Sequence, residues 1–257
     1  MNAFLENIRA RLAKHALCIG LDPEPNLFPD FIQAQEHPIF TFNQAIIDAT
    51  HDLVCCYKPQ IAHFSAVGAE DELEMTIDYL KEYYPDIPII LDAKRGDIGS
   101  TAEKYAIEAF GRYGADALTV NPYLGPDSIE PYLDYEDTGV FVLCHTSNPG
   151  AGTLQALIAD GKPVYEHVVD MVLELDTDTP VGFVVGGTAP DIIAHVRKIA
   201  PESLLLIPGV GTQGGDFNTC REAGGKNAII NVSRAILYTS QGKEFAKKAR
   251  EVAQSFK

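Results

Sequence analysis

Charged side chains of opposite sign alternate after one apolar run of the chain. The run Ile87–Leu91 is followed by Asp92, Lys94 and Asp97. In an extended chain, side chains two residues apart point to the same side, so Asp92 and Lys94 are expected to lie together. One interpretation is an ordinary ion pair at a strand end. The other is catalysis, because a lysine kept protonated by neighbouring carboxylates can act as an acid.

A second lysine favours the catalytic interpretation. Lys58 follows the preceding apolar run, Leu53–Tyr57. Adjacent strands lie only about 4.8 Å apart, so Lys58 would approach Asp92 and Lys94 if the two runs pair. The two lysines and the carboxylates of Asp92 and Asp97 would then form one array of alternating charge. We expect Lys94, Asp92, Asp97 and Lys58 to be the catalytic residues.

Eight short apolar runs recur along the chain, and they indicate the strands that would position these groups. Unbroken apolar runs are typical of strands that are covered on both faces. The runs are Ala16–Leu21, Leu53–Tyr57, Ile87–Leu91, Ala117–Val120, Val140–Cys144, Gly182–Val185, Ser203–Ile207 and Ala228–Val232. Segments of helical periodicity lie between most of them and close the chain: Asp71–Tyr84, Ser100–Tyr113, Val164–Leu175, Pro190–Ile199 and Gly242–Phe256.

This alternation predicts an α/β protein with a single (β/α)₈ TIM barrel. At 257 residues and 46% apolar content, we expect one catalytic barrel domain over residues 1–257, which begins with an amphipathic helix within Met1 to His15. A doubly wound sheet would need a glycine-rich turn after its first strand, but Asp22-Pro23-Glu24-Pro25 stands there. Catalytic groups of such barrels lie at the C-terminal strand ends, where the charged array falls.

A phosphate site is predicted after the seventh and eighth runs. Several glycines between Gly209 and Gly215 would let backbone N–H groups approach an anion, and Arg234 could bind it through two hydrogen bonds. Loops in these positions commonly bind phosphate in this fold. The alternative is that the glycines only form turns and that Arg234 is an ordinary surface residue.

Composition excludes several classes of function. A formal net charge of −16, without a local cluster of Lys and Arg, argues against nucleic acid as a partner. Every apolar run is too short to span a bilayer, and the N-terminal segment does not resemble a secretory signal. Four of the five cysteines lie in apolar runs, which is typical of reduced core residues. We therefore expect a cytoplasmic protein without a membrane partner.

The segment 92–101, Asp-Ala-Lys-Arg-Gly-Asp-Ile-Gly-Ser-Thr, resembles the orotidine 5′-phosphate decarboxylase family, in particular its bacterial branch. The signature of that family at this strand end is Asp-x-Lys-x-x-Asp. The resemblance covers nearly the whole chain in order. It extends through Gly20–Pro23, Tyr57–Gln60, His145–Gly150, Pro208–Gly214 and Asn231–Arg234.

The resemblance implies decarboxylation of orotidine 5′-phosphate to uridine 5′-phosphate, the last step of de novo pyrimidine nucleotide synthesis, without metal or cofactor. It implies that Asp92 lies beside the scissile carboxylate and that Lys94 protonates the ring carbon left behind. Lys58 would hold the array and the ribose, and Asp22 would bind the ribose hydroxyls.

Further residues are implied to bind the nucleotide. Ser147 would contact the amide edge of the pyrimidine, and Gln213, next to Gly214, would bridge base and phosphate. Arg234 would bind the phosphate, and Asn121 is assigned only to the neighbourhood of the site.

The resemblance also implies a homodimer with shared active sites. In that arrangement Asp97, Ile98 and Thr101 would reach across the interface and complete the partner's site.

Three alternative functions agree less well with the charged residues of the sequence. A magnesium-dependent 3-keto-sugar-phosphate decarboxylase or a related synthase resembles the same family, but it places an acidic metal ligand where Lys58 stands here, and a cation there would repel a divalent metal. A class I aldolase would need a depressed pKa at Lys94, whereas flanking carboxylates raise such a pKa. A sugar-phosphate sensor on an inactive barrel would keep Arg234 but would have no use for the charged array.

Overall fold

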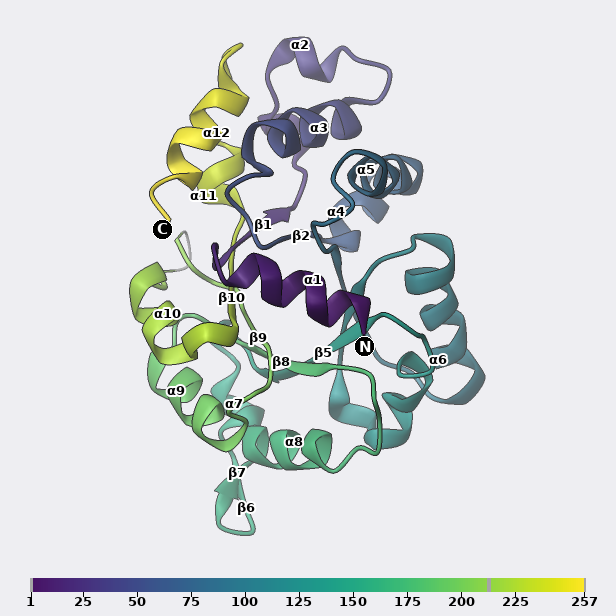
Figure 1. Cartoon of the computed structure of the whole chain (residues 1–257), viewed down its shortest axis with the longest axis vertical. Helices are drawn as coiled ribbons and strands as arrows, with labels where there is room; N and C mark the ends of the chain where they lie inside the picture. The colour runs from purple at the N-terminus through teal and green to yellow at the C-terminus, as the bar shows by residue number, and fades with distance from the viewer. Residues whose placement is uncertain (1, 212–213, 257) are drawn as a thin grey trace.

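The structure, a computed structural model, describes residues 2–211 and 214–256. Eight parallel strands form one sheet in the order β2-β1-β10-β9-β8-β5-β4-β3. Isolated bridges of Tyr57 with Ile89 and of Gln60 with Asp92 join β2 to β3 and close the sheet into a barrel. The predicted (β/α)₈ barrel is therefore confirmed (Figure 1). Its strands are β1 (Leu17–Leu21), β2 (Cys56–Pro59), β3 (Ile90–Arg95), β4 (Ala117–Val120), β5 (Gly139–His145), β8 (Val181–Val185), β9 (Leu205–Ile207) and β10 (Ala228–Val232).

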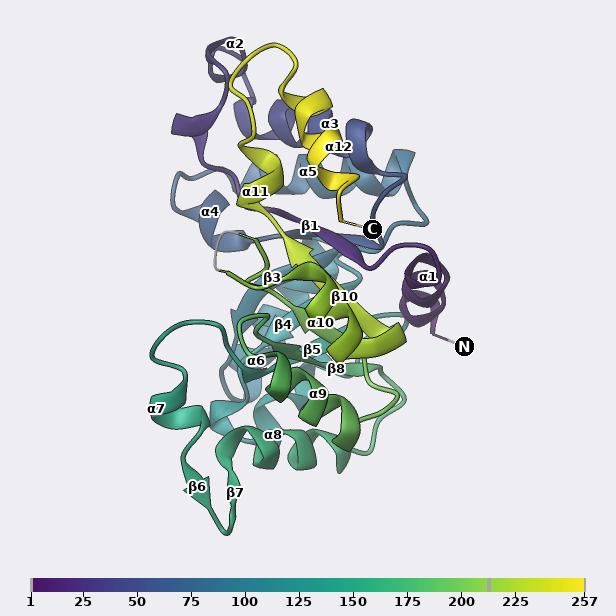
Figure 2. The ribbon, with the colours of Figure 1, turned by 90° about the vertical axis from the view of Figure 1, so that its left-hand side faces the viewer.

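Helices surround the barrel, as Figure 1 shows. They are α1 (Ala3–Leu12), α2 (Asp30–Gln33), α3 (Pro38–Thr50), α4 (Ile61–Ser65), α5 (Glu70–Tyr83), α6 (Gly99–Ala106), α7 (Gly152–Gln155), α8 (Val164–Leu173), α9 (Pro190–Ile199), α10 (Phe217–Gly224), α11 (Arg234–Leu237) and α12 (Phe245–Ala253). A small hairpin of β6 (Ile158–Ala159) and β7 (Lys162–Pro163) projects from the barrel (Figure 2). None of the described helices is long and apolar enough to cross a membrane.

Each predicted helical segment overlaps a helix of the structure, whereas α3 and α10 were not among the predicted segments. The predicted helix Pro190–Ile199 is α9, and the predicted helix Ser100–Tyr113 is α6, continued by a π-helical segment, η2 (Ile107–Arg112). After β4 the described chain forms three short 3₁₀ turns in place of an α-helix. A proline begins or follows the first position of each turn, and its fixed φ and missing N–H are suited to short turns.

The second and third strands differ from their predicted bounds. The apolar runs suggested Leu53–Tyr57 and Ile87–Leu91, but β2 ends at Pro59 and β3 at Arg95. An apolar run marks where a strand is buried among hydrophobic groups, whereas these two strands continue through charged side chains that pair with one another. Lys58, Asp92 and Lys94 therefore lie within strands and not after them.

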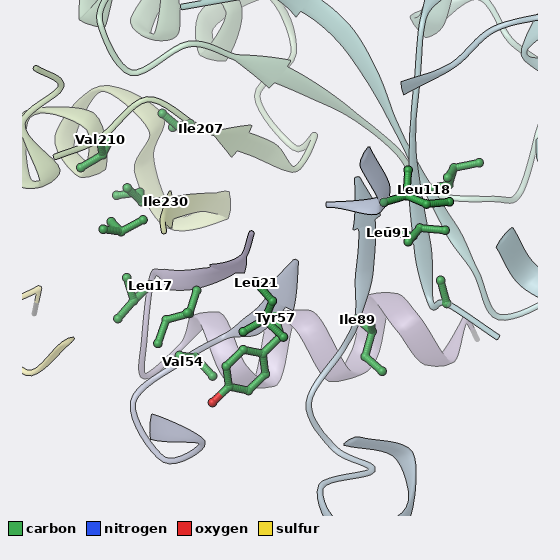
Figure 3. Packing of buried hydrophobic residues seen from close by; sticks show 14 of the residues in the cluster. Leu17, Leu21, Val54, Tyr57, Ile89, Leu91, Leu118, Ile207, Val210 and Ile230 are labelled. Carbon is green, nitrogen blue, oxygen red and sulfur yellow. The ribbon is translucent and has the colours of Figure 1, made fainter. Parts of the chain in front are cut away.

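Successive side chains of each strand point to opposite faces of the sheet, and they form two separate core clusters. Leu17, Ile19 and Leu21 of β1 belong to a large cluster between the strands and the surrounding helices, part of which is drawn in Figure 3. Cys18 of β1 belongs to a second cluster, together with Cys56 of β2 and residues of most other strands, inside the barrel. Moving two residues along each strand from this inner cluster leads to Gly20 and Lys58, at the charged end.

Helix α1 covers the opposite end of the barrel. Its Phe4 and Ile8 are buried in the inner cluster, and the ring of Phe4 packs edge-on against Phe141 with 6.2 Å between ring centroids. A Cβ atom at Gly139 would lie 2.3 Å from the Phe4 ring, so this approach requires glycine. Figure 2 shows α1 and α7 on opposite sides of the strands. The predicted N-terminal helix thus closes the barrel end away from the charged array.

Candidate active site

Three neighbouring strands bring four charged side chains together. Asp22 follows β1, Lys58 lies in β2, and Asp92 and Lys94 lie in β3. The Nζ atom of Lys58 lies 2.9 Å from Oδ2 of Asp92 and 3.9 Å from Oδ1 of Asp22. The Nζ atom of Lys94 lies 2.6 Å from Oδ1 of Asp92. Each carboxylate oxygen of Asp92 therefore has its own ammonium partner, and the expected proximity of these three residues is observed.

The array fixes the charge of its buried members. Burial alone would raise the pKa of Asp92, but the charges of Lys58 and Lys94 outweigh it and hold that pKa well below its ordinary range. Burial alone would likewise lower the pKa of Lys58, and the carboxylates of Asp92 and Asp22 instead hold it above its ordinary value. Asp92 and Lys58 are therefore both charged at neutral pH.

The two lysines differ in accessibility. The side chain of Lys58 is 4% exposed, whereas that of Lys94 is 45% exposed. Lys94 is therefore the lysine of the pair that can exchange a proton with solvent.

The backbone around Lys94 departs from the extended conformation that the sequence suggested. Lys94 has a φ of +46°, and the pairing of β3 with β4 shifts register between Leu91 and Arg95. A non-glycine residue in the left-handed region carries strain, which is typical of functional sites. The charge pair with Asp92 forms across this bulge. Thr119 of β4, which sequence reasoning did not single out, contacts the bulge through the backbone N–H groups of Ala93 and Lys94.

A cavity of about 500 Å³ opens at this end of the barrel, within the size range of small-molecule sites. Six predicted site residues line it: Asp22, Lys58, Asp92, Lys94, Ser147 and Arg234. Sequence reasoning did not assign the other polar and charged lining residues to the site: Glu24, Gln60, His63, Thr146, Asn148, Asn231 and Ser233. Gln60 follows β2 directly and His63 lies in α4, the next element, so their position after a barrel strand was the available signal.

The loop after β9 is a compact glycine-rich turn, in which the N–H groups of Gly211 and Gly215 donate to carbonyl oxygens of the loop itself. Gly209 and Gly211 have φ values of +91° and +84°. A Cβ atom at Gly215 would lie 2.8 Å from the carbonyl oxygens of Gly187 and Gly209, so only glycine fits there. Gly214 is exposed and donates its N–H to the carbonyl of Gly211, outside the residues that line the cavity. The predicted Gln213 lies outside the described residues.

Arg234, the first residue of α11, lines the cavity beyond the end of β10. It is exposed, and its guanidinium forms no ion pair with any residue that the structure describes. A free guanidinium next to a glycine-rich loop is suited to a phosphate group.

The remaining predicted residues lie at the corner between β3 and α6 and just after β4. Asp97 accepts a hydrogen bond from the N–H of Ile98, and Ile98 and Thr101 are exposed. Asn121 caps the turn after β4 by accepting from the N–H of Tyr123. None of these four predicted residues, Asp97, Ile98, Thr101 and Asn121, is among the described residues that line the cavity.

The described residues contain no group of three or more His, Cys, Asp and Glu side chains that could hold a metal ion. The isolated His63 contacts the carbonyl of Pro23 at 3.2 Å and lies 3.3 Å from Glu24. Asp92, the most central carboxylate, is instead occupied by two ammonium groups.

Residues 15–249 match the family described as "Orotidine 5'-phosphate decarboxylase / HUMPS family". Two similar proteins are both named orotidine 5′-phosphate decarboxylase. The one from Janthinobacterium sp. (strain Marseille) is 52% identical, over 97% of this chain and 95% of its own length. The one from Cellvibrio japonicus (strain Ueda107) is 54% identical, over 94% of this chain and 91% of its own length.

Solved structures agree with the sequence matches. The OMP decarboxylase of Leishmania donovani superposes with a TM-score of 0.83 at 34% identity, covering 98% of each chain. The fold and site thus define a barrel enzyme with a cavity at the carboxyl ends of its strands and a buried Asp–Lys array. The chain belongs to the orotidine 5′-phosphate decarboxylase family.

Proposed function

We propose that the protein decarboxylates orotidine 5′-phosphate to uridine 5′-phosphate, the last step of de novo pyrimidine nucleotide synthesis, with Lys94 as the proton donor. The proposal is supported by family membership and by relatives of that name that match nearly the full chain. The observation that carries it is Asp92 held between two ammonium groups, one buried and one accessible from the cavity.

The chemistry needs a fixed positive charge beside the reacting carbon. When the bond between the ring and its carboxylate breaks, carbon dioxide leaves and the electron pair stays on the ring carbon, in the plane of the ring. The π-system cannot delocalise that pair, so a nearby ammonium is the effective means of stabilising it. Lys94 supplies this charge and then donates a proton from Nζ to form the new C–H bond. Its exposed side chain regains a proton from solvent.

Asp92 and Lys58 orient the ammonium group of Lys94. Asp92 accepts from the ammonium group of Lys94 and sets its direction, while Lys58 neutralises the second oxygen of Asp92 from the buried side. Without Lys58, the buried carboxylate of Asp92 would have a single cationic partner, the partly exposed Lys94. Lys58 also occupies the position where a divalent metal would need a ligand, which supports chemistry without a metal.

The nucleotide would be held at both ends of the cavity. We assign the ribose hydroxyls to Asp22 and Lys58, the pyrimidine to Ser147, and the phosphate to Arg234 with the loop that follows β9. Binding energy from the remote phosphate can be used to align the ring with Lys94, as non-reacting groups often do.

The test is the loss of orotidine 5′-phosphate absorbance by the purified protein in excess EDTA. We expect turnover by the wild type and by the control Lys226→Ala, which changes an exposed lysine, and none by Lys94→Ala. Turnover only after magnesium is restored would contradict chemistry without a metal. No turnover of this substrate by the wild type would contradict the function itself.

A homodimer with shared sites is part of the proposal. Asp97, Ile98 and Thr101 lie together at the β3–α6 corner but outside the cavity of their own chain. The corner and the segments near it expose large apolar side chains: Ile98, Ile107, Tyr123 and Leu124. An exposed apolar patch of this kind is suited to a two-fold interface.

Mixing two inactive variants tests the sharing of sites. A mixed dimer of Lys94→Ala and Asp97→Ala would contain one site with both defects and one intact site. Half of randomly paired dimers are mixed, so about a quarter of the sites, and of the wild-type activity, should return. A mixture as inactive as its parents would show that Asp97 serves its own chain.

We also propose a cytoplasmic location. All five cysteines are free and buried, which suits a reducing compartment. The biosynthetic function agrees with that compartment.

A further inference from the structure

Three residues of β3 face a single residue of β4. The strands pair regularly at Ile90 with Ala117 and at Leu91 with Leu118, and the next pair is Arg95 with Val120. Asp92, Ala93 and Lys94 therefore stand opposite Thr119 alone. A bulge of this kind leaves backbone N–H groups without ladder partners, and buried groups of this type need a substitute.

The hydroxyl of Thr119 supplies that substitute. Its Oγ1 accepts from the N–H of Ala93 at 3.1 Å and from the N–H of Lys94 at 2.9 Å. It donates its single proton to Oδ1 of Asp92 at 2.8 Å. A hydroxyl has one donor and two acceptor positions, and all three are used. Because both N–H groups can only donate, the proton of Thr119 must point to Asp92.

The same carboxylate oxygen receives the ammonium group of Lys94. Oδ1 of Asp92 lies 2.6 Å from Nζ of Lys94, so Thr119 contacts the backbone of the lysine and the acceptor of its side chain at once. Thr119 is only 1% exposed and does not line the cavity. Its side chain cannot reach a ligand directly, and any effect on catalysis must pass through Asp92 and Lys94.

We propose that Thr119 is a positioning residue: its hydroxyl holds Lys94 in the left-handed conformation and locks Asp92, so that the ammonium is aimed at the reacting carbon. This inference rests on the proposed decarboxylation. Apolar residues dominate the inside of the barrel, and valine would match the shape of threonine there. The bulge is the feature that requires a hydroxyl.

Steady-state decarboxylation by Thr119→Val and Thr119→Ser tests the proposal. Valine keeps the shape and removes all three hydrogen bonds, whereas serine keeps the hydroxyl. We expect kcat of Thr119→Val to fall about 100-fold, since a displacement of about 1 Å can have that effect, with KM changed less than about threefold. Thr119→Ser should stay within about threefold of the wild type in both constants.

Thr76→Val is the matched control. Thr76 is a fully buried threonine of α5 whose hydroxyl donates to the carbonyl of Glu72, away from the site. The variant Thr76→Val should be less stable than the wild type but should not show the selective fall in kcat that is expected of Thr119→Val. If Thr119→Val does not fold, the pair Thr119→Ala and Thr119→Ser separates the hydroxyl from the methyl group. The proposal would be overturned if kcat fell equally in Thr119→Ser and in the variant without a hydroxyl. A wild-type kcat in Thr119→Val would also overturn it.

Hydrogen exchange separates this inference from the proposed function. The amide protons of Ala93 and Lys94 should exchange faster in Thr119→Val and at the wild-type rate in Thr119→Ser, whatever substrate the enzyme uses. Unchanged exchange in Thr119→Val would refute the positioning role even in an active decarboxylase. A wild type that does not turn over orotidine 5′-phosphate would refute the proposed function. The hydrogen-exchange test of Thr119 would still apply.

Discussion

Replacement of Lys58 by methionine removes a buried cation but leaves its partner in place. Lys58 is 3% exposed and Asp92 is 7% exposed, so neither charge is well solvated. Methionine keeps most of the length and apolar volume of the lysine stem. The change therefore tests the electrostatic contribution of Lys58 more than its packing.

The expected loss of stability follows from opposing contributions. At 2.9 Å the attraction between the two charges is about 6 kcal/mol for an effective dielectric constant of about 20. Removal of Lys58 also removes the desolvation penalty of its ammonium, which is several kcal/mol. Lys94 still neutralises the other oxygen of Asp92. We expect a net loss of about 3 kcal/mol in the free energy of unfolding at pH 7, or roughly 6–12 °C in Tm for a chain of this size.

The loss of stability in Lys58→Met should become smaller as the pH falls. In the wild type the folded pKa of Asp92 is depressed, so its contribution to stability is present above the unfolded pKa of about 3.9 and is lost as pH falls through the folded value. Burial raises the pKa of Asp92, and Lys58→Met removes the larger of the opposing charge effects. Asp92 in the variant is then protonated at higher pH, which relieves the unpaired charge. The difference from the wild type should narrow below about pH 5.

Urea unfolding at pH 7 and at pH 4.5 measures this difference. The control is Lys226→Met, which removes a lysine from an exposed pair with Glu202 at 3.4 Å and should change stability by no more than about 0.5 kcal/mol. A loss in Lys58→Met no larger than in this control would refute the electrostatic reasoning. So would a loss that stays constant or grows at the lower pH.

Three further predictions concern other parts of the molecule. Arg234→Ala should raise KM for the phosphate ester about 100-fold, with a smaller effect on kcat and little effect on a nucleoside substrate without phosphate, as measured by initial rates. The hydrogen bond from Arg250 lowers the pKa of Asp52 to about 2, so Arg250→Ala should lower stability by at most about 1 kcal/mol at pH 7, and this difference should vanish as pH falls from about 4 towards 2 in thermal unfolding. The five cysteines are buried, so a thiol reagent should titrate fewer than about one in the native protein and all of them after unfolding.

Local patterns in the sequence determined much of the architecture. Apolar runs of strand length located the eight barrel strands, and helical periodicity located helices such as α9, because both patterns record which faces of a local element are buried. The same logic placed Asp92 and Lys94 together and put Lys58 on the adjacent strand. For Lys58 and Asp92, the position within an element and the order of elements were sufficient. Lys94 meets Asp92 across a bulge and not along the extended strand that the sequence suggested.

Other features were decided only by the tertiary structure. The left-handed backbone of Lys94 and the bulge opposite Thr119 depend on the register of β3 with β4, and nothing in the apolar run Ala117–Val120 distinguishes its threonine from a packing residue. The lining position of Asn231 likewise depends on how separate strands close the barrel. Register and closure are set by the simultaneous packing of distant segments, so no local window of sequence contains them.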